Sequence, residues 1–459
     1  MKKVYMCLLV LAVLLAVSGC ALGQGSNETT VPPTIAIPTV DIGGTELEYG
    51  VTSLDLTTMA YDLDMLVAAA DRLTEVTDIQ LGQTQLRSDA FRKISEAYPN
   101  ARIAYSIRWL DQEMTKDTTN LNLSTITPDQ TDELLEILPM LPALERISFV
   151  DEEGNCAYGL EDLEQLDKVR IARPELYLQV SFELFGQRVT SEDERIEYYV
   201  VEIGNEGAEV VRQVLPYLRS CTYFLMDGCG IDYEILAQMR EDFPETKIVW
   251  RVWLVEEDYD SKLFLRCGSY LTDTHRIRTT YVNDKNSHVL NYCIETKYVD
   301  VGHVWQLTQC DFLSYMPDLE VCIIAITFIT DITPLANHEK LEYLELFTTD
   351  IEDISPLVTC PNIEHLNLSN MPKLDDVTPV LELKKLKRIR IVDSPLVSDE
   401  EKRMLEEALP DCKHLNWGHW STAWGWRYIG GGKDNPDPRY ALLMEQMEYD
   451  IDYYEYGIP

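Results

Sequence analysis

The hydrophobic pattern of this chain repeats at a fixed interval in its C-terminal third. Between residues 319 and 396 apolar residues recur as L-x-x-L-x-L, followed by a phrase of the form D-I-[ST]-P-L. The phrase occupies 331–335 and 353–357 and returns as D-V-T-P-V at 376–380, so its spacings are 22 and 23 residues. A repeat of this length is typical of an elongated solenoid in which each turn packs on its neighbours.

Each turn predicts a short strand followed by a brief helical segment. At period two the strand places Leu344 and Leu346 in the core. Ser355 or Thr378 is expected to cap a short helical segment that begins with proline. The next strand then stacks in parallel about 4.8 Å away. We therefore expect an α/β fold, a solenoid with a parallel β-ladder on its concave face and helices or 3-10 segments on its convex face.

These turns resemble the 22-residue leucine-rich repeats of internalin-type bacterial surface proteins. The match covers 319–396, and the resemblance implies regular leucine-rich repeats over 302–412. The sequence departs from the family pattern at the asparagine that usually follows the second strand leucine. Thr349 and Met371 stand near that place in two successive turns. The departure concerns the asparagine ladder of the family and leaves the stacking of the turns as expected.

A longer repeat occupies the N-terminal half. Stretches that begin at Pro99, Pro174 and Pro244 align at intervals of 75 and 70 residues, and each alternates apolar residues after a helical stretch. Further strand-like pieces, such as TDIQLG and TYFLM, lie between them. Residues 47–255 are therefore expected to form three long, irregular leucine-rich-repeat-like units. Residues 256–301 fit neither pattern and represent an insertion or diverged repeats.

The first residues have the features of a targeting segment. Two lysines precede an apolar run of 14 residues, shorter than the roughly 20 that a spanning helix needs, and small residues follow it. The end of the run, V-S-G-C, resembles a bacterial lipoprotein signal, which implies a signal peptide over 1–19 and lipid attachment at Cys20. An ordinary signal peptide with an incidental cysteine is the alternative. Residues 20–46 contain several prolines and few large apolar residues, and we expect a flexible tether there.

Charge and cysteine usage narrow the class of partner. Loss of residues 1–19 removes two lysines and no carboxylate, so the formal charge moves from −39 to −41. Such a surface repels phosphate backbones, and nucleic acid is not expected as a partner. None of the eleven cysteines forms a C-x-x-C pair. Cys322 and Cys360 occupy leucine-like positions, which favours buried free thiols over a disulfide framework.

Motifs of catalysis and cofactor binding are missing from the sequence. There is no G-x-S-x-G and no H-E-x-x-H, and the glycine run before Lys433 lacks the Ser or Thr of a phosphate loop. The acidic stretch at Asp151 lacks the spacing of a calcium loop. We therefore expect a protein that is not an enzyme and that uses no cofactor and no metal.

A surface remains as the candidate functional feature. Residues that alternate with the buried leucines should line up along the concave face, one short row for each turn. Tyrosine and arginine are enriched where binding energy concentrates. The residues expected to bind a protein partner are Tyr343, Glu345, Phe347, His365, Asn367, Arg388 and Arg390. The plainer alternative is a solvated ladder in which the two arginines hold neighbouring carboxylates.

The chain ends in aromatic and acidic sequence. Trp417, Trp420, Trp424 and Trp426 lie within ten residues of one another, and an acidic, tyrosine-rich tail follows. Since the last turn of a solenoid has an open apolar face, residues 413–459 are expected to form a Trp-rich cap and tail. The competing interpretation is a sugar-binding platform formed by the tryptophans.

Together these features predict a lipid-anchored protein on the extracytoplasmic face of a bacterial membrane. Its expected function is non-catalytic recognition of another protein or surface macromolecule through the concave face, with membrane contact through the N-terminal lipid only. The alternative is an exported carbohydrate-binding or carbohydrate-active protein, with its active site in residues 256–301. A passive envelope scaffold is a third possibility.

Overall fold

The fold is taken from a computed structural model, which describes residues 37–84, 88–255, 267–416, 418–419, 421–423, 425–429 and 435–449. The signal segment, Cys20 and three of the four clustered tryptophans lie outside these residues. In the described part of the chain no helix is long and apolar enough to cross a membrane. The chain divides into two units, residues 1–116 and 117–459, and each is described by itself.

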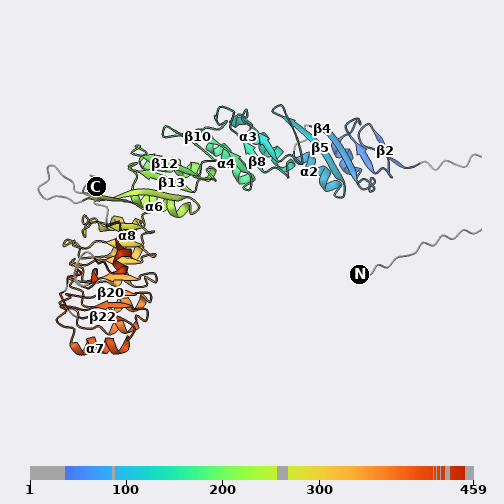
Figure 1. The fold of residues 1–459 in the computed structure, drawn as a ribbon. Coiled ribbons are helices and arrows are strands. Elements are labelled where there is room, and N and C mark those ends of the chain that lie inside the picture. Colours follow the sequence, from blue (N-terminus) through green and yellow to red (C-terminus); the bar gives the residue numbers. More distant parts are fainter. Residues whose placement is uncertain are drawn as a thin grey trace, which may run out of the picture. The chain divides into compact units, whose positions relative to one another are not determined.

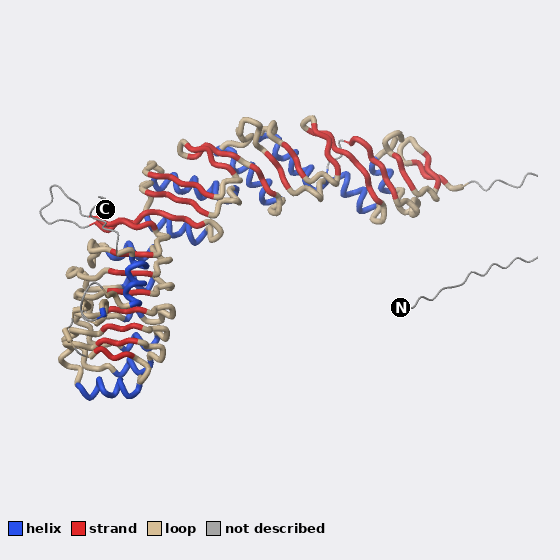
Figure 2. The backbone as a smooth tube through the Cα atoms, in the orientation of Figure 1, coloured by secondary structure: helices blue, strands red, loops and turns tan. Residues whose placement is uncertain are grey.

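The first unit is a small α/β arrangement (Figures 1 and 2). An antiparallel hairpin precedes a four-stranded sheet of order β3-β4-β5-β6, in which β3, β4 and β5 are parallel and β6 is antiparallel. The elements are β1 (Thr39–Asp41), β2 (Glu46–Glu48), β3 (Ser53–Asp55), α1 (Leu63–Ala68), β4 (Asp78–Thr84), α2 (Ser88–Ala97), β5 (Arg102–Trp109) and β6 (Gln112–Thr115).

The hairpin corrects one expected boundary. Val40, Ile42 and Leu47 are buried, and Thr39 pairs with Glu48. The sequence predicts that residues 20–46 form a flexible tether, because they contain several prolines and few large apolar residues. Those few apolar residues suffice, because two short strands can share one buried side. The folded part of the chain therefore begins before residue 47.

The second unit begins with two modules that repeat the topology of the first sheet. Each contains three parallel strands followed by an antiparallel hairpin, which β10 and β11 form as a separate two-stranded sheet in the first module and β14 and β15 form in the second. The first module comprises β7 (Asn120–Asn122), η1 (Pro128–Gln130), α3 (Thr131–Ile137), η2 (Leu138–Met140), β8 (Arg146–Ser148), η3 (Leu160–Asp162), α4 (Leu163–Ala172), β9 (Tyr177–Gln179), β10 (Ser181–Leu184) and β11 (Gln187–Thr190). The second comprises β12 (Arg195–Tyr199), α5 (Gly204–Val214), η4 (Leu215–Tyr217), β13 (Tyr223–Asp227), α6 (Tyr233–Asp242), β14 (Lys247–Val255) and β15 (Cys267–Leu271).

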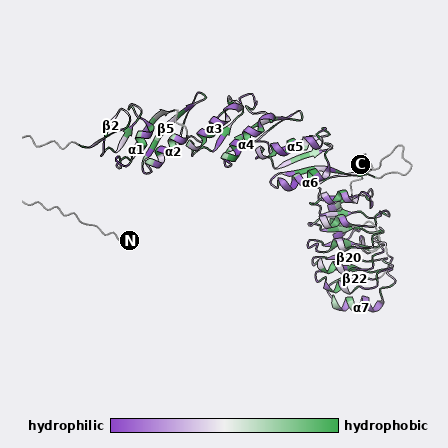
Figure 3. Ribbon diagram, turned by 180° about the vertical axis from the view of Figure 1, so that it is seen from behind, coloured by the Kyte–Doolittle hydropathy of each residue, from purple (hydrophilic) through white to green (hydrophobic). Residues whose placement is uncertain are grey.

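The three proline-marked stretches of the sequence thus fall at equivalent places. Each leads into the third parallel strand of its sheet, namely β5, β9 and β14. The 3-10 turn η1, which leads into α3, begins directly after Thr127, and the backbone N–H of Thr127 donates to Gln130 Oε1 at 3.0 Å. Figure 3 shows hydrophobic and hydrophilic residues alternating through helices and strands, as expected when each element has one buried side.

A seven-stranded parallel sheet, here called the ladder, follows in strict chain order. Its strands are β16 (Arg276–Arg278), β17 (Tyr298–Asp300), β18 (Val321–Ile323), β19 (Tyr343–Glu345), β20 (His365–Asn367), β21 (Arg388–Arg390) and β22 (Lys413–Leu415). The connections carry η5 (Ser287–Tyr292), η6 (Asp311–Tyr315), η7 (Thr333–Leu335), η8 (Ser355–Thr359), η9 (Thr378–Glu382) and α7 (Asp399–Ala408), and α8 (Pro438–Met447) comes last.

The ladder agrees with the register read from the repeats. Tyr343 lies opposite His365, and His365 lies opposite Arg388. Leu344 and Leu346 are fully buried, as predicted. The ladder also extends further toward the N-terminus than the regular pattern does. Since β16 and β17 fall within 256–301, residues 276–301 form turns of the ladder, while 256–266 lie outside the described residues.

The repeated phrase D-I-[ST]-P-L has a different mechanical basis from the one expected. The aspartate, rather than the Ser or Thr, provides the cap. Asp353 Oδ1 accepts the backbone N–H of Ser355 at 2.7 Å, and the same bond joins Asp331 to Thr333 at 2.8 Å and Asp376 to Thr378 at 2.8 Å. The segments that follow are 3-10 turns. A carboxylate two residues earlier reaches the first free N–H of so short a turn.

The eight cysteines whose side chains the structure describes are free thiols, and all of them except Cys156 are buried. The burial of Cys322 and Cys360 agrees with their leucine-like positions. Burial raises the pKa of Cys293 and of Cys310 to about 12. These thiols therefore stay protonated at neutral pH and act as small hydrophobic side chains.

Candidate binding surface

The ladder presents one row of side chains for each strand on the side that faces away from the leucines. We call this side, formed by the first and third residue of each ladder strand, the ladder face. Strand pairing aligns Val321, Tyr343, His365 and Arg388 along one line and Ile323, Glu345, Asn367 and Arg390 along the next. Six of the seven residues expected to bind a partner therefore lie side by side in these two lines, and the seventh, Phe347, follows β19 in the chain.

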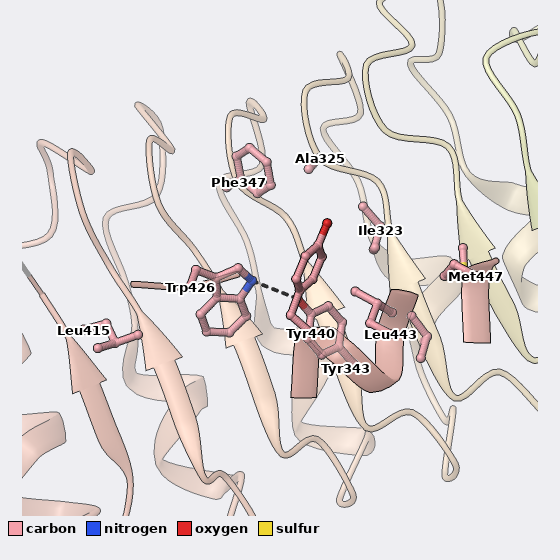
Figure 4. Close-up of a cluster of buried hydrophobic side chains, with 10 residues drawn as sticks. Ile323, Ala325, Tyr343, Phe347, Leu415, Trp426, Tyr440, Leu443 and Met447 are labelled. Atoms are coloured by element: carbon pink, nitrogen blue, oxygen red, sulfur yellow. Dashed lines mark hydrogen bonds between the residues drawn. The ribbon is translucent and has the colours of Figure 1, made fainter. Parts of the chain in front are cut away.

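The ladder face is covered by the end of the chain. We call residues 425–429 and 435–449, which include α8, the strap. Figure 4 shows the strap side chains Trp426, Tyr440, Leu443 and Met447 against the ladder. The apolar part of this contact contains Val321, Ile323, Ala325, Tyr343, Phe347 and Leu415 from the ladder side. Trp426 is 1% exposed, so the strap forms a core with the ladder.

Glu345 is the polar centre of this contact. Its side chain is fully buried. It accepts the indole N–H of Trp426 at 2.8 Å on one oxygen and pairs with Arg427 Nη2 at 2.7 Å on the other. Tyr343 donates its hydroxyl to the same carboxylate. The nearby carboxylate keeps Arg427 charged and holds the pKa of that side chain well above its usual value, against the cost of burial.

Arg388 ties a second part of the strap to the next strand. Its Nη1 pairs with Asp437 at 2.8 Å, and its Nη2 donates to the carbonyl oxygens of Gly425 and Trp426 at 2.8 and 2.6 Å. The guanidinium carbon also lies 4.6 Å from the ring centre of Trp426. Arg388 therefore binds both the carboxylate that starts α8 and the segment before it.

The far end of the strap is fixed over β16 and β17. Arg276 pairs with Glu448 at 2.6 Å and also donates to the carbonyl of Gln446 at 3.2 Å. Arg278 donates to the carbonyl of Glu448 at 3.3 Å, and Tyr449 donates its hydroxyl to Asp300. Polar contacts thus hold the strap along the ladder, from β21 back to β16.

This cover overturns the expectation that the two arginines of β21 are exposed. Arg388 is 5% exposed and Arg390 is 0% exposed, and the other residues of the expected binding set are also buried. Their role in binding a separate protein stays a prediction. The residues that sequence reasoning missed are those of the strap, such as Arg427 and Tyr440. The signal was present, since Tyr440, Leu443 and Met447 are spaced as one face of a helix that needs a partner.

The tryptophan cluster was expected to cap the last turn. Trp426 instead lies over the side of the ladder, where its ring centre is 5.9 Å from that of Tyr343. Trp417, Trp420 and Trp424 lie outside the described residues. An aromatic residue can close the apolar side of a parallel ladder as well as its end, and the polar neighbours Tyr343 and Glu345 give the indole N–H two acceptors there.

Among the described residues, a second part of the strand surface is uncovered. On the sheet β12–β15, Tyr199 is 56% exposed and Trp253 is 39% exposed. Arg251 is fixed beside Trp253 by two hydrogen bonds from its Nε, at 2.9 and 3.0 Å, and one from its Nη2, at 2.8 Å, to Asp227. Its guanidinium carbon is 5.9 Å from the Trp253 ring. This combination of rigid aromatic and arginine side chains has the composition of binding hot spots.

Burial shapes the ionisable side chains of the ladder face. Among those residues no group of three or more His, Cys, Asp or Glu could hold a metal ion. Burial, with Arg439 and Arg388 nearby, lowers the pKa of His365 to about 3, so its imidazole is neutral at physiological pH. Burial and Glu345 hold the pKa of Tyr343 well above its usual value.

No protein-family model and no curated protein matches this chain. Among solved structures it is similar to internalin C2 of Listeria monocytogenes, with 21% identity, a TM-score of 0.22, and coverage of 28% of this chain and 63% of that one. An internalin F of the same organism has 13% identity and a TM-score of 0.28, and the match covers 82% of this chain and 84% of that one. A leucine-rich-repeat protein of Leptospira interrogans has 11% identity and a TM-score of 0.29, and the match covers 80% of this chain and 93% of that one.

This chain covers less than two thirds of the length of internalin C2. Such low TM-scores support no argument about activity. The α/β class with parallel sheets therefore rests on the strand pairing of this chain itself, and these neighbours are leucine-rich-repeat proteins of bacteria.

Proposed function

We propose that this chain is a non-catalytic recognition protein, anchored through a lipid on Cys20 to the extracytoplasmic face of a bacterial membrane. In this proposal the parallel strands line the concave side of a leucine-rich-repeat solenoid, and the helices and 3-10 turns lie on the convex side. The partner is another protein. The observation that carries the proposal is the exposed pair Tyr199 and Trp253, beside an arginine fixed by Asp227.

The two parts of the strand surface have different roles in this proposal. Tyr199, Arg251 and Trp253 form the accessible contact. The set predicted from sequence, from Tyr343 to Arg390, binds the chain's own strap and reaches a partner only after the strap has left. Rigid aromatic side chains lose little conformational entropy on binding, which suits the accessible set to recognition.

Chemical cross-linking at the surface of intact cells that carry the full chain identifies the partner. Binding is then measured between the purified partner and the chain from residue 21 onward, which keeps every described residue. Trp253→Ala and Tyr199→Ala should each weaken binding at least tenfold, the size expected of a hot spot. Tyr315→Ala is the matched control, since Tyr315 is 49% exposed but lies on η6, away from the strand surface.

A partner that binds Trp253→Ala and Tyr199→Ala as tightly as the native chain would contradict the proposed contact. The anchor is tested separately. Cys20→Ser should abolish incorporation of a labelled fatty acid and release the protein from the membrane fraction. Binding of glycans that is lost in Trp424→Ala would support the carbohydrate-binding alternative instead.

A further inference from the structure

Buried nitrogen atoms without a hydrogen-bond partner gather where the strap meets the ladder. The atoms are His365 Nδ1, Asn367 Nδ2, Arg388 Nε, Arg390 Nε, Arg390 Nη1 and Arg427 Nε. Every amide and guanidinium nitrogen among them carries hydrogen and can only donate. The six nitrogens therefore lack acceptors within hydrogen-bond distance, although the Asn416 oxygen just beyond β22 is also unpaired. Since buried polar groups in proteins are almost always paired, a cluster of one polarity calls for a missing partner of the other.

Two of these side chains are direct neighbours. Asn367 and Arg390 lie opposite each other on β20 and β21, strands that are about 4.8 Å apart. The orientation of Asn367 follows from its hydrogen bonds, because its Oδ1 accepts the backbone N–H of Ser369 at 3.1 Å. Its amide nitrogen is therefore the free end. Arg390 uses only Nη2, which donates to the carbonyl of His419 at 2.6 Å.

Charge at the boundary is unbalanced at the same place. Arg388 has Asp437 as its carboxylate partner, and Arg427 has Glu345. Arg390 is fully buried, and within the described ranges no ion pair joins it to a carboxylate. A guanidinium remains charged at neutral pH even here, where burial and Arg388 lower the pKa of Arg390 to about 10. An unpaired buried charge is among the most costly features that a fold can contain.

We propose that Arg390 and Asn367 bind a small oxyanion between the strap and the ladder. The ligand is a carboxylate or a tetrahedral phosphate or sulfate group, because either offers several acceptor oxygens and a negative charge to donors on adjacent strands. The bound anion neutralises Arg390 and so holds the strap in place. Anions should bind at this site in preference to the rest of the chain, because the rest of the chain is strongly acidic and repels anions.

The test measures amide hydrogen exchange of α8 in the chain from residue 21 onward. Sodium phosphate, sodium acetate and sodium chloride are compared at matched ionic strength. Phosphate or acetate at ten times its dissociation constant should slow α8 exchange about tenfold, because a ligand that binds only the closed form shifts the opening equilibrium by that factor. Response to phosphate alone assigns a tetrahedral group, and response to acetate assigns a carboxylate.

Variants locate the site. Arg390→Met should remove the response to both oxyanions. Arg276→Met is the matched control, because Arg276 also holds the strap from the ladder face but has a carboxylate partner of its own in Glu448. This control should loosen the strap and keep its response. If Arg390→Met does not fold, Asn367→Leu serves in its place and should weaken the response at least tenfold.

Two results would overturn the proposal. One is equal exchange of native α8 in phosphate, acetate and chloride, which would mean that water or any counterion satisfies the donors. The other is an undiminished oxyanion response in Arg390→Met or Asn367→Leu. The measurement on the native chain stands without any variant.

Discussion

Trp426 donates its indole N–H to Glu345, a residue 81 positions earlier in the chain, at 2.8 Å, and both side chains are buried. The contact joins the strap to the third residue of β19. A carboxylate at this place would be costly without partners, and it has three, namely Tyr343, Trp426 and Arg427. The end of the chain is therefore part of the fold of the ladder.

Glu345→Gln should release the strap. The amide keeps the shape of the side chain but leaves Arg427 buried without its carboxylate, which costs about 3–5 kcal/mol in comparable buried pairs. Amide exchange of α8 should rise steeply, while the helices α5 and α6 keep their protection. Glu197→Gln is the control, because Glu197 also pairs with an arginine on a strand but is partly exposed. Unchanged α8 exchange in Glu345→Gln would show that the carboxylate does not hold the strap.

Acid should loosen the strap through His365. The folded state lowers its pKa from 6.5 to about 3, so the unfolded or open state binds more protons below pH 6.5, and stability falls as pH decreases toward 3. Between pH 7.5 and pH 4.5 this amounts to about 2–3 kcal/mol. The difference between the native chain and His365→Asn separates this effect from the titration of carboxylates.

The control for that comparison is His275→Asn, since the His275 side chain is 60% exposed. This variant should follow the pH dependence of the native chain. Parallel pH profiles of strap exchange for native and His365→Asn chains would contradict the role assigned to His365.

The aspartates of the repeated phrase should each contribute a cap. Asp353→Ala removes the acceptor of the Ser355 N–H and should cost about 1 kcal/mol of stability, a typical value for a lost capping side chain. Chemical denaturation of the variant, followed by tryptophan fluorescence, gives the measurement. Glu352→Ala is the control, because Glu352 is the exposed neighbour of Asp353, and it should lower stability less than Asp353→Ala does. Equal effects at the two positions would mean that general charge, and not the cap, is responsible.

Buried thiols should resist alkylation. Because burial raises the pKa of Cys293 and Cys310 to about 12, they expose almost no thiolate at pH 8. Iodoacetamide should leave both unmodified in the folded chain and label both after denaturation, as read by mass spectrometry. An exposed thiol introduced by Glu352→Cys should react in the folded chain. Rapid native labelling of Cys310 would show that its turn opens.

Sequence periodicity predicted the inward half of the ladder well. The rule that side chains alternate along a strand places Leu344 in the core and Tyr343 on the opposite side, and the spacing of the phrase sets which residues lie opposite one another. This rule says nothing about what covers the opposite side. Whether Arg390 meets solvent or another segment depends on a contact with His419, and no local pattern encodes a contact between such separated parts of the chain.

Two other misses have similar causes. The predicted tether reaches residue 46 because this segment has several prolines and few large apolar residues. Val40 is buried through its pairing with Leu47 across a hairpin, which the composition of the segment does not reveal. The cap was assigned to Ser355 by the usual rule for α-helices. In the five-residue 3-10 turn that begins at Ser355, Asp353 instead accepts the backbone N–H of Ser355 itself.

The covered ladder face has a consequence for descent. Ladder residues that bind another protein change in sequence as that protein changes. Ladder residues that contact the same polypeptide must change together with the residues they contact. Positions 345 and 427 should therefore be inherited as a matched pair across relatives, with acid and base lost or exchanged together. Variation driven by changing partners should concentrate instead on the uncovered strands around Tyr199 and Trp253.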